Sequence, residues 1–334
     1  MIERHTFPDS RIIDSLTDDY GFSVDALLFL PIGADADASV YRAQLRDGSE
    51  YFVKLKRGYE HDISVVIARL LYDSGIEQII PPAMTVREQP LQKIGDFTLI
   101  VYPFIEGKDG FARKLDDHHW VALGEVLRRV HSFTLAEVIQ KQVRRENYSP
   151  KWREAVRSLL SLVKADIGGD ESALNLAKFM SAQSAKINRL VDRSEQLAKE
   201  ISKRDPEFVL CHSDMHGGNV LIDSHEALFV VDWDEPIMAP KERDLMFIGG
   251  SVGNVWNKPD EEKLFYEGYG QVSVDMQLLA YYRHERVVED IALYGHDLLL
   301  TTDGGEDRPK MFTQVAEMFD ANGAVEMAFR TDRG

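Results

Sequence analysis

Three residues in the second half of the chain have the types and the spacing that phosphoryl transfer requires. The segment HSDMHGGN places Asp214 and Asn219 behind an apolar run, and Asp232 follows at the end of the apolar run LFVV. Phosphoryl transfer needs a carboxylate beside the attacking hydroxyl and oxygen ligands for Mg²⁺, because the developing charge lies on phosphate oxygens. Apolar residues on both sides of the first motif indicate a loop between two short strands, and the next strand would deliver Asp232. The pattern therefore predicts a site for Mg²⁺.

The same segments resemble those of the aminoglycoside phosphotransferases, kinase-like enzymes whose catalytic loop reads H-x-D-x-x-x-x-N. Further segments are similar to the branch of this family that acts on spectinomycin: YFVKLKRGY, SPKWRE, DWDEPIMAPKERDLMFIGG, VGNVWNKP, YEGYG and YYRHERVVEDIA. The resemblance covers most of the chain. It implies an ATP-dependent phosphotransferase that modifies a hydroxyl of an aminocyclitol or aminoglycoside antibiotic, with spectinomycin favoured, and that gives resistance.

The resemblance also implies roles for individual residues around the catalytic loop. Asp214 would be the catalytic carboxylate, and Asn219 and Asp232 would bind Mg²⁺. Asp244, in KERDLMF, would brace the catalytic loop by hydrogen bonds, and His212 would anchor the backbone of that loop. Positioning of the acceptor hydroxyl is the main task expected of the carboxylate, since a loose transition state demands little base strength.

A kinase-like first lobe needs a cation on its third strand to hold the α and β phosphates. In YFVKLK, strand alternation puts Lys54 and Lys56 on the same face, so periodicity leaves both open. The family resemblance favours Lys54. Its acidic partner is expected at the start of the following helix, where Glu60 and Asp62 are both available and Asp62 could equally be the N-cap. We take Asp62 as the partner.

Two further segments concern the nucleotide. The turn PIGADADAS lies where the phosphate loop belongs, but it has the acids Asp35 and Asp37 in place of a glycine-rich run, and it reads equally as a polar hairpin turn. In VYPFIEG, which resembles the interlobe hinge of the family, Pro103 can only accept a hydrogen bond through its carbonyl, whereas the Ile105 amide can donate one. Adenine needs one of each, so ATP is expected over GTP.

A cationic acceptor should be bound by carboxylates, and the second half of the chain supplies several. Asp234 and Glu235 follow the metal-binding aspartate, and Tyr282, Glu285 and Glu289 recur at helical spacing in YYRHERVVED. The helical set predicts either one wall of an acceptor site or a solvated helix face. Both interpretations stay open from the sequence.

Composition limits the class of partner. The 334 residues carry 56 acids against 39 bases, a formal charge of −17, which disfavours nucleic acids and anionic membranes and favours a small cationic molecule. The single cysteine, Cys211, lies in an apolar run and is expected in the core. Neither a signal peptide nor a stretch long enough to span a membrane is apparent, so we expect a cytoplasmic protein.

The order of the predicted elements indicates an α+β, bilobal, protein-kinase-like fold. Short β-type runs dominate from residue 21 to 105 and are interrupted once by the helical segment DISVVIARLLYDSG. Helical patterns dominate beyond residue 107. We therefore expect a nucleotide-binding lobe, residues 1–105, with an antiparallel sheet and one inserted helix, and a mainly helical catalytic and substrate-binding lobe, residues 106–334.

Other functions use parts of the same pattern. His212, Asp214, His216 and Asp232 include the ligand types of a two-metal hydrolase, which would leave Lys54 without a role. A kinase-like module that binds ATP without turnover is a second alternative, and the complete catalytic set argues against it. Within the kinase interpretation, acceptors such as choline, homoserine or methylthioribose remain open, because the core motifs are shared.

Overall fold

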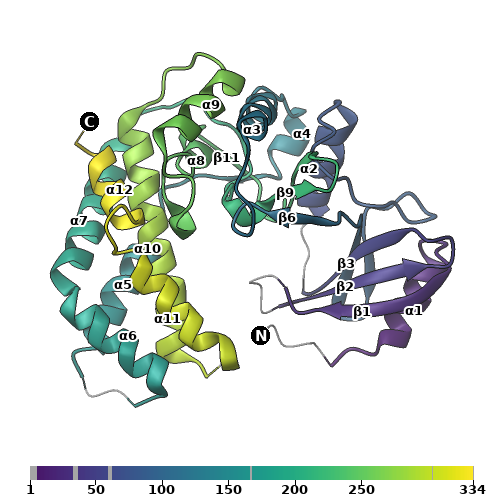
Figure 1. Ribbon diagram of the computed structural model, residues 1–334, viewed down its shortest axis with the longest axis horizontal. Coiled ribbons are helices and arrows are strands. Elements are labelled where there is room, and N and C mark those ends of the chain that lie inside the picture. The colour runs from purple at the N-terminus through teal and green to yellow at the C-terminus, as the bar shows by residue number, and fades with distance from the viewer. Residues whose placement is uncertain (1–5, 33–36, 59–61, 166–167, 303, 334) are drawn as a thin grey trace. The chain divides into compact units, whose positions relative to one another are not determined.

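The computed structural model describes residues 6–32, 37–58, 62–165, 168–302 and 304–333, and the chain divides into two compact units (Figure 1). Unit 1 consists of Met1–Asp109 and Asn219–Pro236, and unit 2 consists of Gly110–Gly218 and Ile237–Gly334. This division differs from the expected lobes 1–105 and 106–334. The segment Asn219–Pro236 returns to unit 1 because its first strand pairs with the last strand of the N-terminal segment.

Unit 1 is built on an antiparallel five-stranded sheet of order β1-β2-β3-β5-β4 and a three-stranded sheet of order β10-β9-β6. Its elements are α1 (Asp9–Asp18), β1 (Val24–Leu30), β2 (Ala38–Leu45), β3 (Glu50–Arg57), α2 (Asp62–Asp73), β4 (Gln92–Ile94), β5 (Phe97–Pro103), β6 (Gly107–Asp109), β9 (Val220–Asp223) and β10 (Leu228–Val230). Helix α2 is the predicted inserted helix.

Strand β3 shows why the sheet can present charge on one face and pack on the other. Successive strand side chains point to opposite faces. Val53 and Leu55 are fully buried in an apolar cluster with α1, whereas Lys54 and Lys56 alternate with them and so lie on the other face. Helix α1 was not expected from the sequence, although Ile12 and Leu16 give it an apolar face that this cluster buries.

Unit 2 is mainly helical and contains one small sheet of order β7-β11-β8. Its helices are α3 (Asp117–His131), α4 (Glu137–Gln140), α5 (Lys151–Leu162), α6 (Glu171–Ala182), α7 (Ser184–Ile201), α8 (Glu242–Leu245), α9 (Pro259–Tyr269), α10 (Met276–Leu300), α11 (Arg308–Glu317) and α12 (Ala324–Thr331). Its strands are β7 (Arg144–Arg145), β8 (Val209–Cys211) and β11 (Ile237–Ala239). The mainly helical character expected beyond residue 107 is confirmed.

Helix α10 organises the core of unit 2, where it packs against α5, α7 and α12 (Figure 1). The Asp275 carboxylate caps its N-terminus by accepting from the amides of Gln277 and Leu278, at 3.0 and 3.2 Å. Buried residues of α10 such as Val288 and Ile291 join one large apolar cluster with residues of the neighbouring helices. A helix covered on several sides holds its polar residues in fixed positions, which matters for the site below.

The fold class predicted from the sequence is confirmed: the structure is α+β, with an antiparallel N-terminal sheet and a mainly helical second unit. Cys211 is buried, as expected. Within the described residues, no helix has both the length and the apolar content needed to cross a membrane.

Candidate active site

In unit 1, two lysines of β3 contact two aspartates that follow β10. Lys54 Nζ lies 3.1 Å from Asp232 Oδ1 and 2.7 Å from Asp234 Oδ2, and Lys56 Nζ lies 3.1 Å from the same Asp234 oxygen. Lys54 is largely buried, whereas Asp232 is half exposed. The structure therefore brings Lys54 together with the predicted metal ligand Asp232, and the sequence had not indicated that Asp234 bridges both lysines.

The electrostatics of this cluster keep Lys54 and Asp234 charged. Burial lowers the pKa of the Lys54 ammonium, but the charges of Asp232 and Asp234 outweigh burial and hold that pKa above its usual range. Burial likewise raises the pKa of the Asp234 carboxyl, and the two lysines more than offset it, so that this pKa is lowered. Phosphate oxygens could replace the carboxylates around the buried lysine, and a metal ion could replace the lysine beside the carboxylates. The cluster therefore suits both kinds of charged group.

The hairpin of β9 and β10 places Asn219 and Asp232 near each other. Val230 pairs with Val220, and the Val231 amide donates to the Asn219 carbonyl at 3.0 Å, so Asp232 lies one residue beyond the position opposite Asn219. Asp232 has a φ of 63°, a left-handed conformation that non-glycine residues rarely adopt and that turns the chain away from the strand direction. Both side chains offer the oxygen donors that Mg²⁺ prefers, so the donor set fits this ion.

The predicted hinge residues lie at the end of β5. Pro103 pairs with Tyr51 of β3, and the next residue, Phe104, donates its amide to the Glu50 carbonyl at 3.0 Å. In an antiparallel ladder, hydrogen-bonded and non-hydrogen-bonded pairs alternate. Pro103 is therefore in a non-hydrogen-bonded pair, and its carbonyl points away from β3. Ile105 lies two residues after Pro103, so in an extended chain its backbone groups would point to the same side as those of Pro103.

Two predicted nucleotide contacts fall wholly or partly outside the described residues. Asp62 is the first residue of α2, but its side chain is not among those described, so its pairing with Lys54 stays a prediction. The turn PIGADADAS includes residues 33–36, which also lie outside the described ranges.

In unit 2, the Asp214 carboxylate is held by two basic side chains. Asp214 Oδ1 lies 2.6 Å from Arg286 Nη1 of α10, and Asp214 Oδ2 lies 3.2 Å from His216 Nε2. Burial raises the pKa of this carboxyl, but the charge of Arg286 and the hydrogen bond from His216 lower it well below its usual range. The carboxylate is therefore ionised at neutral pH and is a weak base, which suits a group that positions a hydroxyl.

Asp244 fixes the start of the catalytic loop, as the sequence predicted. Its Oδ2 accepts from the His212 amide at 2.8 Å, and its Oδ1 accepts from the Ser213 amide at 2.7 Å. Asp244 is fully buried, and His131 Nε2 lies 3.1 Å from its Oδ2. Ser213 has a φ of 76°, and this unfavourable conformation is stabilised by the two hydrogen bonds.

The helical acceptor set predicted from the sequence needs correction. Tyr282 and Glu285 are 0% and 5% exposed, so they form neither a solvated face nor an open wall. The Glu285 carboxylate accepts from Arg153 Nη1 at 2.5 Å and from the Ser194 hydroxyl, inside the helical core. The reason is that α10 is covered by α5 and α7 on this side. Glu289 is half-buried beside Arg286, and Glu235 of unit 1 is exposed.

Arg286 is a residue of the candidate site that sequence reasoning missed. It lies inside YYRHERVVED, a segment already singled out for its acids, and it is flanked there by Glu285 and by Asp290 one turn later. A basic residue between acids at helical spacing reads as an ordinary surface ion pair. Its contact with Asp214 depends on the fold, because 72 residues separate the two in the chain.

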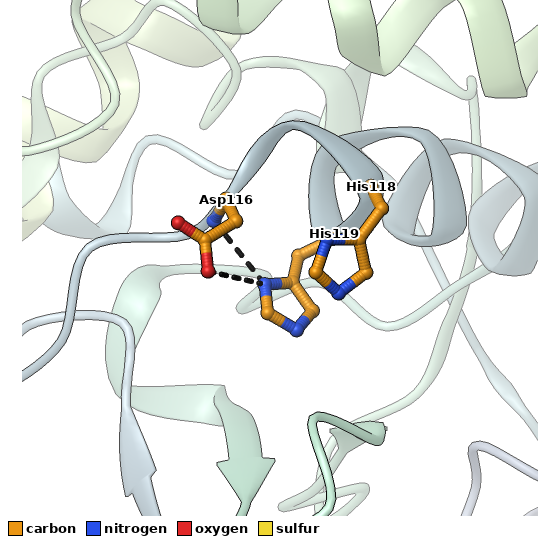
Figure 2. A group of neighbouring side chains, drawn as sticks. All are labelled: Asp116, His118 and His119. Carbon is orange, nitrogen blue, oxygen red and sulfur yellow. Dashed lines mark hydrogen bonds and ion pairs between the residues drawn. The ribbon is translucent and has the colours of Figure 1, made fainter.

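A separate cluster of possible metal ligands lies at the start of α3. Figure 2 shows Asp116 facing the ring of His119, with His118 beside it. The Asp116 amide donates to His119 Nδ1 at 3.2 Å, and Asp116 Oδ2 lies 3.9 Å from the same nitrogen. The first of these contacts belongs to the N-terminal capping box of the helix, so the ring nitrogen that faces Asp116 already accepts a hydrogen bond.

The two-metal hydrolase considered above would need ligands from both units, His212, Asp214 and His216 from unit 2 and Asp232 from unit 1. Across the described ranges, the ligand groups that gather are the α3 cluster and the buried set His131, Cys211 and Asp244. Neither group is the predicted set of His212, Asp214, His216 and Asp232.

Comparisons with known proteins agree with this geometry. The phosphotransferase enzyme family matches residues 29–272. Crystal structures of spectinomycin phosphotransferase APH(9)-Ia are similar: one with ADP and spectinomycin has 47% identity and a TM-score of 0.90, and one with AMP has 46% identity and a TM-score of 0.86. Both comparisons cover 97% of this chain and 98% of the other.

Amicoumacin kinase of Bacillus subtilis (strain 168) is 24% identical over 243 residues, which are 69% of this chain and 64% of that protein. The chain thus spans just under two thirds of the length of that relative. From the family match and the high identity to solved structures over nearly the whole chain, the predicted class of enzyme, an O-phosphotransferase, is confirmed. This chain belongs to the phosphotransferase enzyme family.

Proposed function

We propose that this protein transfers the γ-phosphoryl group of ATP to a hydroxyl of an aminocyclitol antibiotic, with spectinomycin as the substrate. The observation that carries the substrate is the 47% identity, over 97% of the chain, to a phosphotransferase solved with ADP and spectinomycin. The observation that supports the chemistry is the arrangement around Asp214 in unit 2 and around Lys54 and Asp232 in unit 1. A cytoplasmic location and a role in resistance are part of the proposal.

For the nucleotide, Lys54 is the proposed phosphate ligand, and Asp62 is its proposed partner. Lys54 is buried and stays charged, so negative phosphate oxygens can take over the places of the carboxylates that contact it now. The Pro103 carbonyl and the Ile105 amide would pair with the adenine edge. The parity of Pro103 in the ladder supports this, because its carbonyl is directed away from β3.

Asn219 and Asp232 are the proposed ligands of Mg²⁺, which the kinase reaction requires. When bound, the ion supplies positive charge against the phosphate oxygens. The contact of Lys54 with Asp232 would hold that carboxylate in place before the nucleotide arrives. The remaining ligands would come from the nucleotide and water, as is usual for this ion.

Asp214 would orient the acceptor hydroxyl and accept its proton. The acceptor oxygen forms a bond to the γ-phosphorus, the bond from that phosphorus to the β-γ bridging oxygen breaks, and ADP leaves with the electron pair. The proton passes to Asp214 late in the reaction and then to solvent. The low basicity of Asp214 is compatible with this order, since the hydroxyl becomes acidic only as the new bond forms.

The cationic groups of the acceptor remain to be matched with acids. Glu235 and Glu289 are the proposed ligands, because they are exposed and half-buried respectively. Asp234 is retained as a proposed ligand, although its contacts with Lys54 and Lys56 favour a role beside the nucleotide. Tyr282 and Glu285 are no longer proposed, since both are buried in the helical core.

A direct test is ADP release from ATP with Mg²⁺ and separate additions of spectinomycin, amicoumacin, kanamycin, hygromycin, choline and homoserine. Stimulation by spectinomycin, together with a phosphorylated product in mass spectrometry, is expected. Asp214→Ala should lower kcat by about 10²- to 10⁴-fold with ATP binding retained, and Asp232→Ala should abolish Mg²⁺-dependent turnover. A fully active Asp214→Ala protein would refute the mechanism. Stimulation by another acceptor alone would refute the substrate, and ATP binding with no turnover would favour a binding module.

A further inference from the structure

Arg286 lies between two carboxylates in the interior of unit 2. Its Nη1 is 2.6 Å from Asp214 Oδ1, and its Nε is 3.0 Å from Asp290 Oδ1. Its side chain is 17% exposed, and its guanidinium carbon lies 5.5 Å from the centroid of the Phe247 ring, within the range of a cation–π contact. The guanidinium is therefore fixed by three different neighbours.

The contact with Arg286 restricts the orientation of the Asp214 carboxylate. Arg286 engages Oδ1, and His216 lies 3.2 Å from Oδ2. A carboxylate bound at only one oxygen can swing about its side-chain bonds, whereas one bound at both oxygens keeps a single orientation. His216 is itself stacked on Phe111, with ring centroids 5.4 Å apart, so this second contact also comes from a constrained group.

We infer that Arg286 is a positioning residue for the proposed phosphoryl transfer, holding the Asp214 carboxylate in one orientation. This inference rests on the proposed function, because it assigns a role in the same reaction. Arg286 acts through Asp214 and is not itself assigned a contact with the substrate.

Asp290 gives this arrangement its second half. Arg286 and Asp290 lie one turn apart on α10 and contact each other. This contact holds the Arg286 guanidinium in the direction of the catalytic loop. A guanidinium has five N–H donors in a rigid plane, which lets one side chain serve two carboxylates. A lysine at this position would have a single nitrogen and could not span both acids with the same geometry.

Several charged groups act on this pair and must be kept in view in any titration. Asp214 interacts with Arg286, His216 and His212, and Arg286 interacts with Asp290, Asp214, Glu289 and Arg243. The charge of Arg286 is the largest single cause that lowers the pKa of Asp214, and it opposes the effect of burial. Removing the guanidinium charge should therefore raise the pKa of Asp214 toward or above the ordinary value of about 4.

The test compares Arg286→Gln and Arg286→Lys with wild type, and Arg330→Gln serves as the matched control. Arg330 also forms an ion pair with an acid one turn away on its helix, at 2.7 Å from Glu326, but it is 54% exposed. With the acceptor that the wild type uses, Arg286→Gln should lower kcat about 10- to 100-fold, the range for losing a hydrogen bond between charged groups. KM for ATP should change by less than about twofold, since the nucleotide contacts proposed above lie in unit 1.

The pH profile separates positioning from a general structural effect. In Arg286→Gln, kcat should fall below about pH 5, because Asp214 becomes protonated there, whereas the wild-type profile should stay flat in that range. Arg286→Lys keeps a positive charge, so it should retain the flat profile while losing about tenfold in kcat through poorer orientation. Arg330→Gln should match wild type in both readouts.

The carboxyl titration of Asp214 can be followed without any acceptor, by ¹³C NMR of aspartate-labelled protein with Asp214→Asn for assignment. A wild-type protein that phosphorylates none of the acceptors would refute the proposed function, and this titration would still test Arg286. An unchanged titration in Arg286→Gln would overturn the inference, as would wild-type kcat in both variants. Should Arg286→Gln fail to fold, Arg286→Lys carries the kinetic test, and a wild-type kcat there overturns the inference.

Discussion

Replacing Glu285 by Gln tests whether α10 carries a buried structural ion pair or an acceptor ligand at this position. The sequence left the acceptor wall open, but Glu285 is 5% exposed and accepts from Arg153 Nη1 at 2.5 Å and from the Ser194 hydroxyl. Gln has the same shape and can keep one acceptor oxygen, so the change removes mainly the charge. Arg153 would then be a buried cation without its carboxylate.

The size of the effect follows from what Arg153 retains. Removing one partner of a buried pair typically costs about 3–5 kcal/mol, because the other charge stays desolvated. Here Arg153 Nη2 also donates to the carbonyls of Tyr148 and Ser149, at 3.0 and 3.1 Å, and these bonds survive the change. We therefore expect the lower end of the range, a loss of about 3 kcal/mol in the free energy of unfolding.

The assay is urea unfolding followed by circular dichroism and by tryptophan fluorescence, since coincident transitions are needed to treat the unfolding as two-state. Glu195→Gln is the control: Glu195 pairs with Arg157 across α5 and α7, but both side chains are about one third exposed, so the loss should stay below about 1 kcal/mol. KM for the acceptor should be unchanged in Glu285→Gln. A stable Glu285→Gln protein whose KM for the acceptor rises tenfold would refute the assignment of this carboxylate to the core.

Three further outcomes are expected. Lys54→Met should raise KM for ATP and lower kcat by about 10²-fold, whereas Lys56→Met should change both by less than about tenfold, as ADP-release kinetics would show. Gly268→Ala should destabilise unit 2 by about 3 kcal/mol in urea unfolding, because the new Cβ would lie 1.9 Å from the Val121 carbonyl oxygen of α3. Burial raises the pKa of Asp290 to about 6, so its stabilising contribution is complete below about pH 4 and is lost as the pH rises through 6; thermal unfolding of Asp290→Asn should lack this decline.

The types and spacing of Asp214, Asn219 and Asp232 predicted phosphoryl transfer, and the comparisons confirm that class of reaction. The roles of the three residues stay predictions. The choice between Lys54 and Lys56 was beyond strand periodicity, since both side chains lie on the same face of β3. In the structure both lysines contact Asp234, and Lys54 also contacts Asp232. The difference between the two lysines therefore lies in tertiary contacts, which strand periodicity does not predict.

The environment of α10 could not be predicted from its own sequence. Its residues alternate between apolar and charged types in a way that suggests one solvated face, yet α5, α7 and α12 pack around it. Glu285 and Arg286 are consecutive residues that point to different partners, Arg153 and Asp214, which lie 132 and 72 residues away in the chain. Such contacts depend on tertiary packing, which overrides the local pattern.

The charge of the whole chain and the charge at the site give different information. The formal charge of −17 disfavours an anionic macromolecule as a partner, but the acids of the candidate site are largely paired with cations. Asp232 is paired with Lys54, and Asp214 is paired with Arg286. Because these acids are already paired with cations, the acceptor ligands proposed above, Glu235 and Glu289, are the first to test. Substituting Glu235 and Glu289 separately by Gln and measuring KM for the acceptor would test them, and a residue count alone would have singled out neither.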